Sequence, residues 1–178
     1  MPGSVEVDLS QQAKNLLKQF PGRASKVTSE LKTVIDKLSA WVMREMLKAF
    51  PDQKQPGGEA WDQNGGMYAL VKLAEQGQSR AGYLSGALAR SISRQVLDGG
   101  LAARVSSPLE YAGAFNNGQI LPLVIQMQLN GQSIQVRTAG GPSPARPFMP
   151  EEGYLKRETK KLTTALMKDI KARLEGKK

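Results

Sequence analysis

The side chains best suited to catalysis near neutral pH are missing from this sequence. Its 178 residues include no histidine and no cysteine. There is therefore no imidazole base, no thiol nucleophile, no Cys/His zinc site and no disulfide framework. Much of enzyme chemistry is therefore out of reach, whereas chemistry that uses carboxylates alone is possible in principle.

Two groups of carboxylates are the candidates for such chemistry. Glu151 and Glu152 are adjacent, and they fit the solvated first turn of a helix better than an acid–base pair. Asp52, Glu59 and Asp62 lie close together in sequence, but their spacing matches no calcium-binding loop. We therefore expect no catalytic residue, no metal, no cofactor and no enzyme activity.

The charge of the chain raises the question of nucleic-acid binding. Lysine and arginine outnumber acidic residues 25 to 16, which gives a net charge of +9 and a pI near 9.9. The excess is spread along the chain without a basic arm, and no aromatic residues alternate with arginine as in a base-stacking surface. Contact with phosphates is compatible with this pattern, whereas sequence readout is not supported.

Hydrophobic periodicity predicts four helices, which start from capping or dipole signals and stop at Pro or Gly. They cover residues 8–20, 25–49 and 68–76 and a C-terminal helix from near Pro150. In the first, Asp8 and Gln11 have the spacing of a capping box. No stretch is apolar enough to cross a membrane, and we expect a soluble protein without a leader.

Strand patterns occupy the centre of the chain. Residues 91–97 and 101–106 flank a Gly-containing turn and predict one hairpin. A second hairpin is predicted by alternating apolar residues over 123–136 around the two-residue turn Asn130-Gly131. That turn places Met127 opposite Ile134 and Ile125 opposite Val136, so both strands present their apolar residues on one face.

The predicted fold class is α+β: a twisted antiparallel β-sheet with a long β-hairpin, packed by a long N-terminal helix and a C-terminal helix. Residues 1–24 are expected to form an N-terminal arm with a short helix, and residues 25–178 a single domain. Residues 51–66 have the composition of an inserted mobile loop. Trp61 in this loop either docks on a partner or folds back onto its own domain.

Three short motifs follow one another in the second half of the chain. The first, Ser85 to Ile92, has the pattern Gly-x-Leu-x-x-Ser-Ile at the entry to a strand. The second joins Tyr111-Ala112 to Phe115 and Asn117-Gly118, and the third is Pro144-Ala-Arg-Pro-Phe-Met149 before the last helix. Together they resemble the tailed-bacteriophage neck and tail-completion proteins, a family that includes virion morphogenesis, minor tail-component and head–tail joining proteins.

The resemblance, which spans roughly residues 80 to 175, implies a structural subunit of the virion, assembled in the host cytoplasm. It implies a homo-oligomeric ring, hexameric on the tail axis, around the passage of the genomic DNA. The implied partners are the tail tube or terminator and the head connector, with DNA contacted without sequence specificity. The same resemblance leaves open a tail terminator ring that caps the tail tube, and it implies contacts between subunits through the long hairpin and the terminal helices.

The motif residues also have physical interpretations. Pro144 and Pro147 hold the chain extended, so that Phe148 is delivered to a fixed place against the sheet and the last helix. Arg146 between them can bind backbone carbonyls or a carboxylate. The candidates for architectural or interface roles are Trp61, Gly86, Leu88, Ser91, Tyr111, Ala112, Phe115, Arg146, Pro147 and Phe148.

Two functions of other classes stay open beside the virion subunit. The charge of +9 is compatible with a small basic DNA-binding protein. A hydrolase that uses two carboxylates in one cleft is the other alternative.

Overall fold

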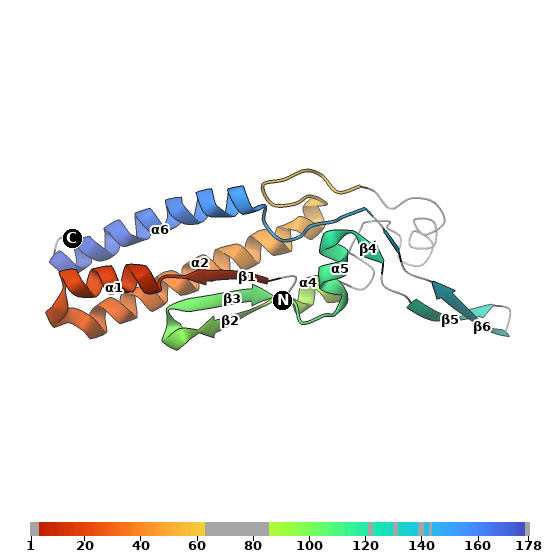
Figure 1. The fold of residues 1–178 in the computed structure, drawn as a ribbon, viewed down its shortest axis with the longest axis horizontal. Helices are drawn as coiled ribbons and strands as arrows, with labels where there is room; N and C mark the ends of the chain where they lie inside the picture. The colour runs from red at the N-terminus through yellow and green to blue at the C-terminus, as the bar shows by residue number, and fades with distance from the viewer. Residues whose placement is uncertain are drawn as a thin grey trace.

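The computed structural model describes residues 4–62, 86–120, 123–129, 132–138, 141–142 and 144–176. Over these residues the chain is α+β, as its sequence predicts. A three-stranded antiparallel sheet carries a long helix, and a second long helix lies on the first (Figure 1). No helix in the described ranges is long and apolar enough to cross a bilayer.

The sheet has the strand order β1-β3-β2. β2 (Ser93–Leu97) and β3 (Ala102–Ser106) are the predicted hairpin, joined by the 3-10 turn η2 (Asp98–Gly100). The third strand, β1 (Ser4–Asp8), pairs with the other side of β3 and was not predicted. Its register places Glu6 opposite Arg104, which in turn lies opposite Gln95 on β2.

The segment expected as an N-terminal arm is therefore part of the domain. Val5 and Val7 alternate with exposed residues and are buried in the core, as a half-buried strand requires. Helix α1 (Ser10–Gln19) follows, with Leu9 rather than Asp8 at its N-cap and no capping box. Asp8 instead accepts hydrogen bonds from the Ser10 amide at 2.7 Å and the Ser10 hydroxyl at 2.6 Å, which lower the pKa of its carboxyl.

Helix α2 (Ala24–Asp52) is the centre of the molecule. Its predicted apolar stripe is buried along the whole length of the helix, from Val27 through Leu38 to Phe50. The helix continues past the predicted end at Ala49, because the fully buried Phe50 ring holds its last turn in the core. It stops where Gln53 adopts a left-handed conformation with φ of 51°.

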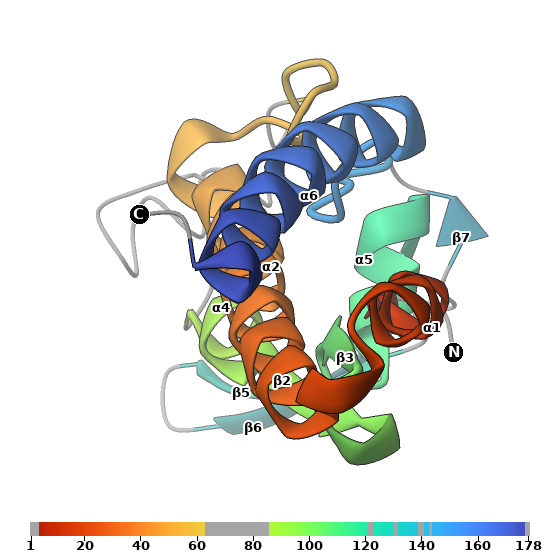
Figure 2. The same ribbon diagram turned by 90° about the vertical axis from the view of Figure 1, so that its left-hand side faces the viewer.

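Helix α6 (Glu152–Glu175) lies along α2 on the side away from the sheet, so the layers run sheet, α2, α6 (Figure 1). It begins two residues after the predicted start, with Glu151 as its N-cap. Only Ile170 and Leu174 are buried, near its C-terminal end. Figure 2 views the molecule along its long axis. In this view α6 lies at the top and α1 at the right, both above β3.

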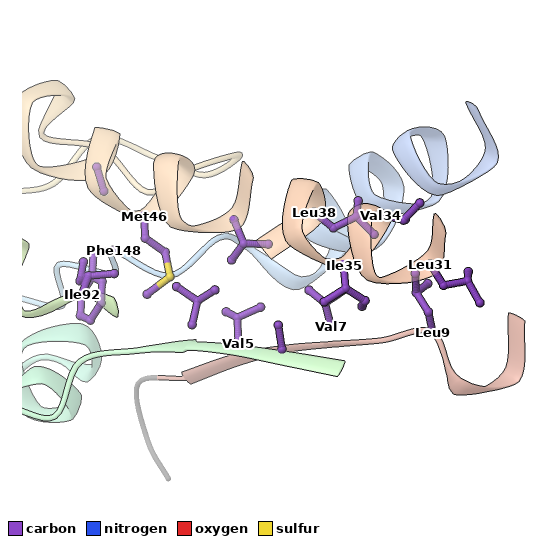
Figure 3. Packing of buried hydrophobic residues seen from close by; sticks show 14 of the residues in the cluster. Val5, Val7, Leu9, Leu31, Val34, Ile35, Leu38, Met46, Ile92 and Phe148 are labelled. Atoms are coloured by element: carbon purple, nitrogen blue, oxygen red, sulfur yellow. The ribbon is translucent and has the colours of Figure 1, made fainter. Parts of the chain in front are cut away.

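One hydrophobic core joins these layers. Val5, Val7 and Leu9 from the N-terminal segment meet α2 residues such as Ile35 and Leu38, as Figure 3 shows. The same cluster includes Ile92 and Phe148 beyond Met46 on α2. The core therefore runs from the sheet to the segment before α6.

The remaining elements lie toward one end of the long axis (Figure 1). They are the short helices α4 (Ala87–Ser91) and α5 (Tyr111–Asn117), the pair β4 (Gln119–Ile120) and β7 (Gly141–Pro142), and the hairpin of β5 (Leu123–Leu129) and β6 (Gln132–Thr138). The register pairs Met127 with Ile134 and Ile125 with Val136, which confirms the predicted hairpin pairing. The predicted helix at 68–76 and the turn residues Asn130 and Gly131 lie outside the described residues.

Candidate assembly surfaces

Four aromatic side chains from four separate segments form a cluster at the C-terminal end of α2. Phe50, Trp61, Phe115 and Phe148 make up this aromatic cluster. The ring centroids of Phe50 lie 5.7 Å from both Trp61 and Phe148, and those of Trp61 and Phe115 lie 5.6 Å apart. Such pairs add stability beyond the burial of their area. Phe148 is fully buried, as its position after Pro147 predicts.

The Pro144–Met149 segment is tied to its surroundings by its backbone and by Arg146. The Arg146 guanidinium donates to the backbone carbonyl of Asp62 at 3.3 Å, so it binds a carbonyl rather than a carboxylate. The Trp61 indole donates to the carbonyl of Pro147 at 3.0 Å. These bonds hold the motif residues and the cluster in one rigid unit.

One residue of this unit was not singled out from the sequence. The Asn116 side-chain oxygen accepts hydrogen bonds from the backbone amides of Phe148 at 3.2 Å and Met149 at 3.3 Å. The partners are 32 and 33 residues away along the chain, so nothing local to Asn116 indicates them. The proximity of Asn116 to Phe115 in the second motif is the one signal that pointed to this part of the chain.

Residues 53–62, which lie in the segment expected to be a mobile loop, form a strap with internal backbone bonds. Lys54 and Ala60 form a β-bridge, and the Trp61 amide donates to the carbonyl of Gln53 at 2.7 Å. Trp61 is only 4% exposed, so it folds back onto its own domain instead of docking on a partner. Residues 63–66 lie outside the described residues.

The strap also contacts the start of α6. The Glu151 amide donates to the carbonyl of Pro56 at 3.0 Å. Gly57 has φ of 79°, and its backbone lies close to Tyr154. A Cβ added to Gly57 would be 2.3 Å from the Cβ of Tyr154 and 2.3 Å from the nearest ring carbon. The Tyr154 hydroxyl donates to Glu45 on α2 at 2.9 Å, and burial together with this bond raises the pKa of Tyr154 to about 12.

The first motif has an architectural place as well. Gly86 begins α4 in the left-handed conformation, with φ of 66°, and Leu88 is buried in the core. The Ser91 hydroxyl donates to the carbonyl of Leu88 at 2.7 Å and lies 2.7 Å from the hydroxyl of Ser107. This places the end of α4 against the segment that follows β3.

Burial separates the predicted candidates into two groups. Ala112 is buried, and Phe115, Arg146 and Pro147 are partly buried within the unit described above. Tyr111, at the first position of α5, is 40% exposed and is the exposed member of the ten candidates. The motif residues other than Tyr111 therefore shape the domain, and surfaces for partners are found elsewhere.

One such surface is an open groove between β1 and α6, with a volume of about 1050 Å³. One wall is the strand from Glu6 to Leu9, and the other is α6 from Glu152 to Glu175. Lysines follow its α6 side at residues 156, 160, 168 and 171. The Lys156 ammonium lies 2.6 Å from Glu152, which lowers the pKa of that carboxyl and raises the pKa of the lysine.

The second such surface is the β5–β6 hairpin. It lies at the end of the molecule beyond α5 and β4 (Figure 1). Within the described residues, its two strands pair with each other along their whole length. By register and alternation, Ile125, Met127, Ile134 and Val136 share one face of this ribbon.

The carboxylates considered for chemistry have structural partners. The Glu151 carboxylate accepts the backbone amides of Gly153 at 3.3 Å and Tyr154 at 3.2 Å, which caps α6. Glu152 is paired with Lys156. Within the described ranges, no three acidic side chains are grouped as a metal site would need.

Comparison with known proteins adds no relative. No protein-family model matches the chain. Searches of curated proteins and of solved structures likewise found no match.

Proposed function

We propose that this chain is a structural subunit of a tailed-bacteriophage virion at the head–tail junction. It forms a ring around the DNA passage and joins the tail to the head connector. The observation that carries the proposal is the convergence of the three motifs on one core. Leu88, Ala112 and Phe148 come from three segments and belong to a single hydrophobic cluster.

This convergence supports the proposal because it gives the motifs a joint role. Each motif is short and unspecific alone, and Gly-x-Leu or Ala-Arg-Pro-Phe could recur by chance. Residues that must meet in one core have to be present together and in a fixed order. The resemblance then rests on a set of mutually packed residues that position a hairpin and a terminal helix.

The placement of the surfaces also supports a ring. The groove lies along β1 and α6, whereas the hairpin lies beyond α5 at one end of the molecule (Figure 1). Two different surfaces on one subunit favour head-to-tail contacts, which close into a ring when the rotation between neighbours allows it. In this proposal the ring binds the tail tube or terminator on one side and the head connector on the other.

A basic DNA-binding protein is the second candidate function. It is favoured by the lysines at residues 156, 160, 168 and 171, which follow one side of α6. Such a row can contact phosphates without reading sequence. Glu152, Asp169 and Glu175 on the same helix weaken its positive potential, so we rank this function below the ring subunit.

Electron microscopy together with DNA titration separates the two functions. For the ring subunit, negatively stained particles are rings with a central opening, and affinity for duplex DNA is weak. For the DNA-binding protein, particles are single subunits, and affinity falls about 10³-fold or more between 50 and 200 mM salt if several phosphates are contacted. Single subunits with that salt dependence would overturn the proposed function.

A further inference from the structure

β2 is an edge strand that is paired on one side. It is the terminal strand at the end of the sheet opposite β1, and no strand in the described ranges pairs with its outer edge. Figure 1 shows β2 at the border of the molecule, on the side away from α6. Four of its five residues are exposed, and Val96 is 61% exposed. An open edge of this kind is a template for another strand.

The hydrogen-bond pattern of the sheet determines which backbone groups of β2 point outward. The Leu9 amide donates to the carbonyl of Leu101 at 3.0 Å, in the same register as the β1–β3 pair. Because bonding alternates along an antiparallel strand, the β3 residue opposite Gln95 bonds to β2 and not to β1. The backbone N–H and C=O groups of Arg94 and Val96, on either side of Gln95, therefore point away from the sheet.

The side chains at this edge are compatible with a close contact. Those of Arg94 and Val96 lie on the face toward α2, and that of Gln95 lies on the other face. The Arg94 guanidinium lies 2.8 Å from the Asp36 carboxylate on α2, so its charge has a partner within its own subunit. Val96 and Ile35 line an open pocket of about 560 Å³ between β2 and α2. The edge therefore offers an exposed apolar side chain, and the charge on β2 is already paired.

Two copies of β2 match each other in one antiparallel register. When Gln95 lies opposite Gln95 of a second copy, Arg94 of each copy lies opposite Val96 of the other. All the outward backbone groups of these two residues are then hydrogen-bonded. A register centred on Arg94 would place two guanidinium groups opposite each other, which is unfavourable. One centred on Val96 would place Arg94 opposite the turn η2, which is not extended.

We propose that β2 pairs with β2 of a second copy in the register centred on Gln95, which gives a two-fold dimer with one continuous antiparallel sheet. The occupant is a second copy because the match is self-complementary. Each strand supplies the outward backbone groups that the other needs, and the aliphatic part of each Arg94 covers Val96 of the other copy.

The position of α2 leaves room for this pairing. The helix packs mainly on β3, so the axes of the two α2 helices would be about three strand spacings, or about 14 Å, apart. Helices in direct contact are about 8–10 Å apart. The paired strands therefore meet without the two helices colliding.

The pairing goes beyond the proposed ring and does not rest on it. It joins the same surface of two copies, whereas a ring joins two different surfaces. A junction between head and tail also needs two different faces, which a two-fold pair does not have. The pair is therefore a state of subunits that have not entered a ring.

Disulfide formation tests the register directly, because the natural chain has no cysteine. In the proposed pair the two Gln95 residues form a non-hydrogen-bonded pair with Cα atoms about 4.5 Å apart, which is within the range of a disulfide. The matched control is Ser93→Cys, on the same strand and the same face and likewise exposed. Its two Cα atoms would be about 14 Å apart, too far for a disulfide.

We expect Gln95→Cys to give a disulfide-linked dimer in a glutathione redox buffer, and Ser93→Cys to stay monomeric on a non-reducing gel. Equal yields from the two variants, or no dimer from Gln95→Cys, would overturn the pairing. Rings in electron micrographs without a Gln95→Cys dimer would overturn the pairing and leave the proposed function standing. A Gln95→Cys dimer without rings at any concentration would support the pairing and overturn the proposed function.

Charge substitutions at the two exposed large apolar residues, Val96 and Tyr111, provide a second test. Val96→Lys places an ammonium group opposite the Arg94 guanidinium of the other copy, so the dissociation constant of the dimer should rise at least about ten-fold. Tyr111→Lys adds the same charge away from β2 and should leave this constant unchanged. Sedimentation equilibrium measures both, and circular dichroism verifies that both variants are folded. The same dissociation constant for the two variants would contradict the pairing.

Discussion

At the residue scale, the aromatic cluster explains how four distant segments are held together. Phe50, Trp61, Phe115 and Phe148 come from α2, the strap, α5 and the segment before α6. Hydrogen bonds of Trp61, Arg146 and Asn116 fix the backbone around these rings. The chain continues from α5 toward the hairpin and from the Phe148 segment into α6. The way this unit is held therefore determines where both surfaces lie.

Truncation of Phe148 tests the cluster. Phe148 is fully buried, and Phe148→Ala should lower the free energy of unfolding by about 3–5 kcal/mol through lost burial and the cavity left behind. Tyr111→Ala is the matched control, because the 40% exposed ring should cost less than about 1 kcal/mol. Urea denaturation of both variants measures the difference. Equal losses would show that Phe148 does not anchor the core.

The hydrogen bond between Tyr154 and Glu45 gives the fold a dependence on high pH. The pKa of Tyr154 is raised from its ordinary value of 10.0 to about 12 by burial and by this bond. The folded chain therefore keeps its proton where the unfolded chain has lost it, and this contribution to stability is present below pH 10 and lost as the pH rises toward 12. The wild-type free energy of unfolding should fall more steeply over that range than that of Tyr154→Phe. Parallel pH profiles would contradict the assignment.

Sequence reasoning succeeded at residues whose neighbours along the chain determine their role. The burial of Phe148 was expected from the prolines around it, although its ring neighbours are Phe50 of α2 and Phe115 of α5 rather than the sheet and the last helix. For Arg146 the sequence allowed a carbonyl or a carboxylate, and the structure shows the carbonyl of Asp62. Sequence reasoning did not decide the place of Trp61, because the partners of the indole are 11 residues before it and many residues after it. Asn116 was missed for the same reason.

At the scale of elements, the strap connects the end of α2 to the start of α6. It does so through backbone bonds at Pro56 and through Gly57, whose backbone lies against Tyr154. This contact sets the direction in which α6 departs along α2. The groove next to α6 depends on that direction.

Two glycine substitutions test the contact between the strap and α6. Gly57 and Gly99 both have positive φ, so Ala at either position costs about 1–2 kcal/mol in backbone strain. Only at Gly57 would the added Cβ meet a side chain, that of Tyr154, which should add about 1–3 kcal/mol. Thermal denaturation should therefore give a lower Tm for Gly57→Ala than for Gly99→Ala. Equal Tm values would show that the strap moves freely away from α6.

The elements differ in how far their sequences determine them. The apolar stripe of α2 and the alternation of β5 and β6 are local patterns. The stripe predicted the helix, and the alternation predicted the two strands together with their pairing. Strand β1 was read as part of an arm because it has five residues and its partner β3 lies about a hundred residues later. Short strands with distant partners carry little local signal. The groove that β1 lines could not be predicted either.

At the scale of the whole molecule, the groove between β1 and α6 lies beside the layers of sheet, α2 and α6. The hairpin lies at the end of the long axis beyond α5 and β4 (Figure 1). The charge of +9 is spread along the chain, over strands as well as helices.

Sedimentation velocity of the wild-type protein over a wide concentration range tests the ring most directly. A closed ring reaches one defined mass, which then stays constant as concentration rises, because closure leaves no head-to-tail contact surface of any subunit unused. We expect a single oligomeric species of this kind. A protein that stays monomeric throughout, or whose mass grows without limit as in an open filament, would contradict the account.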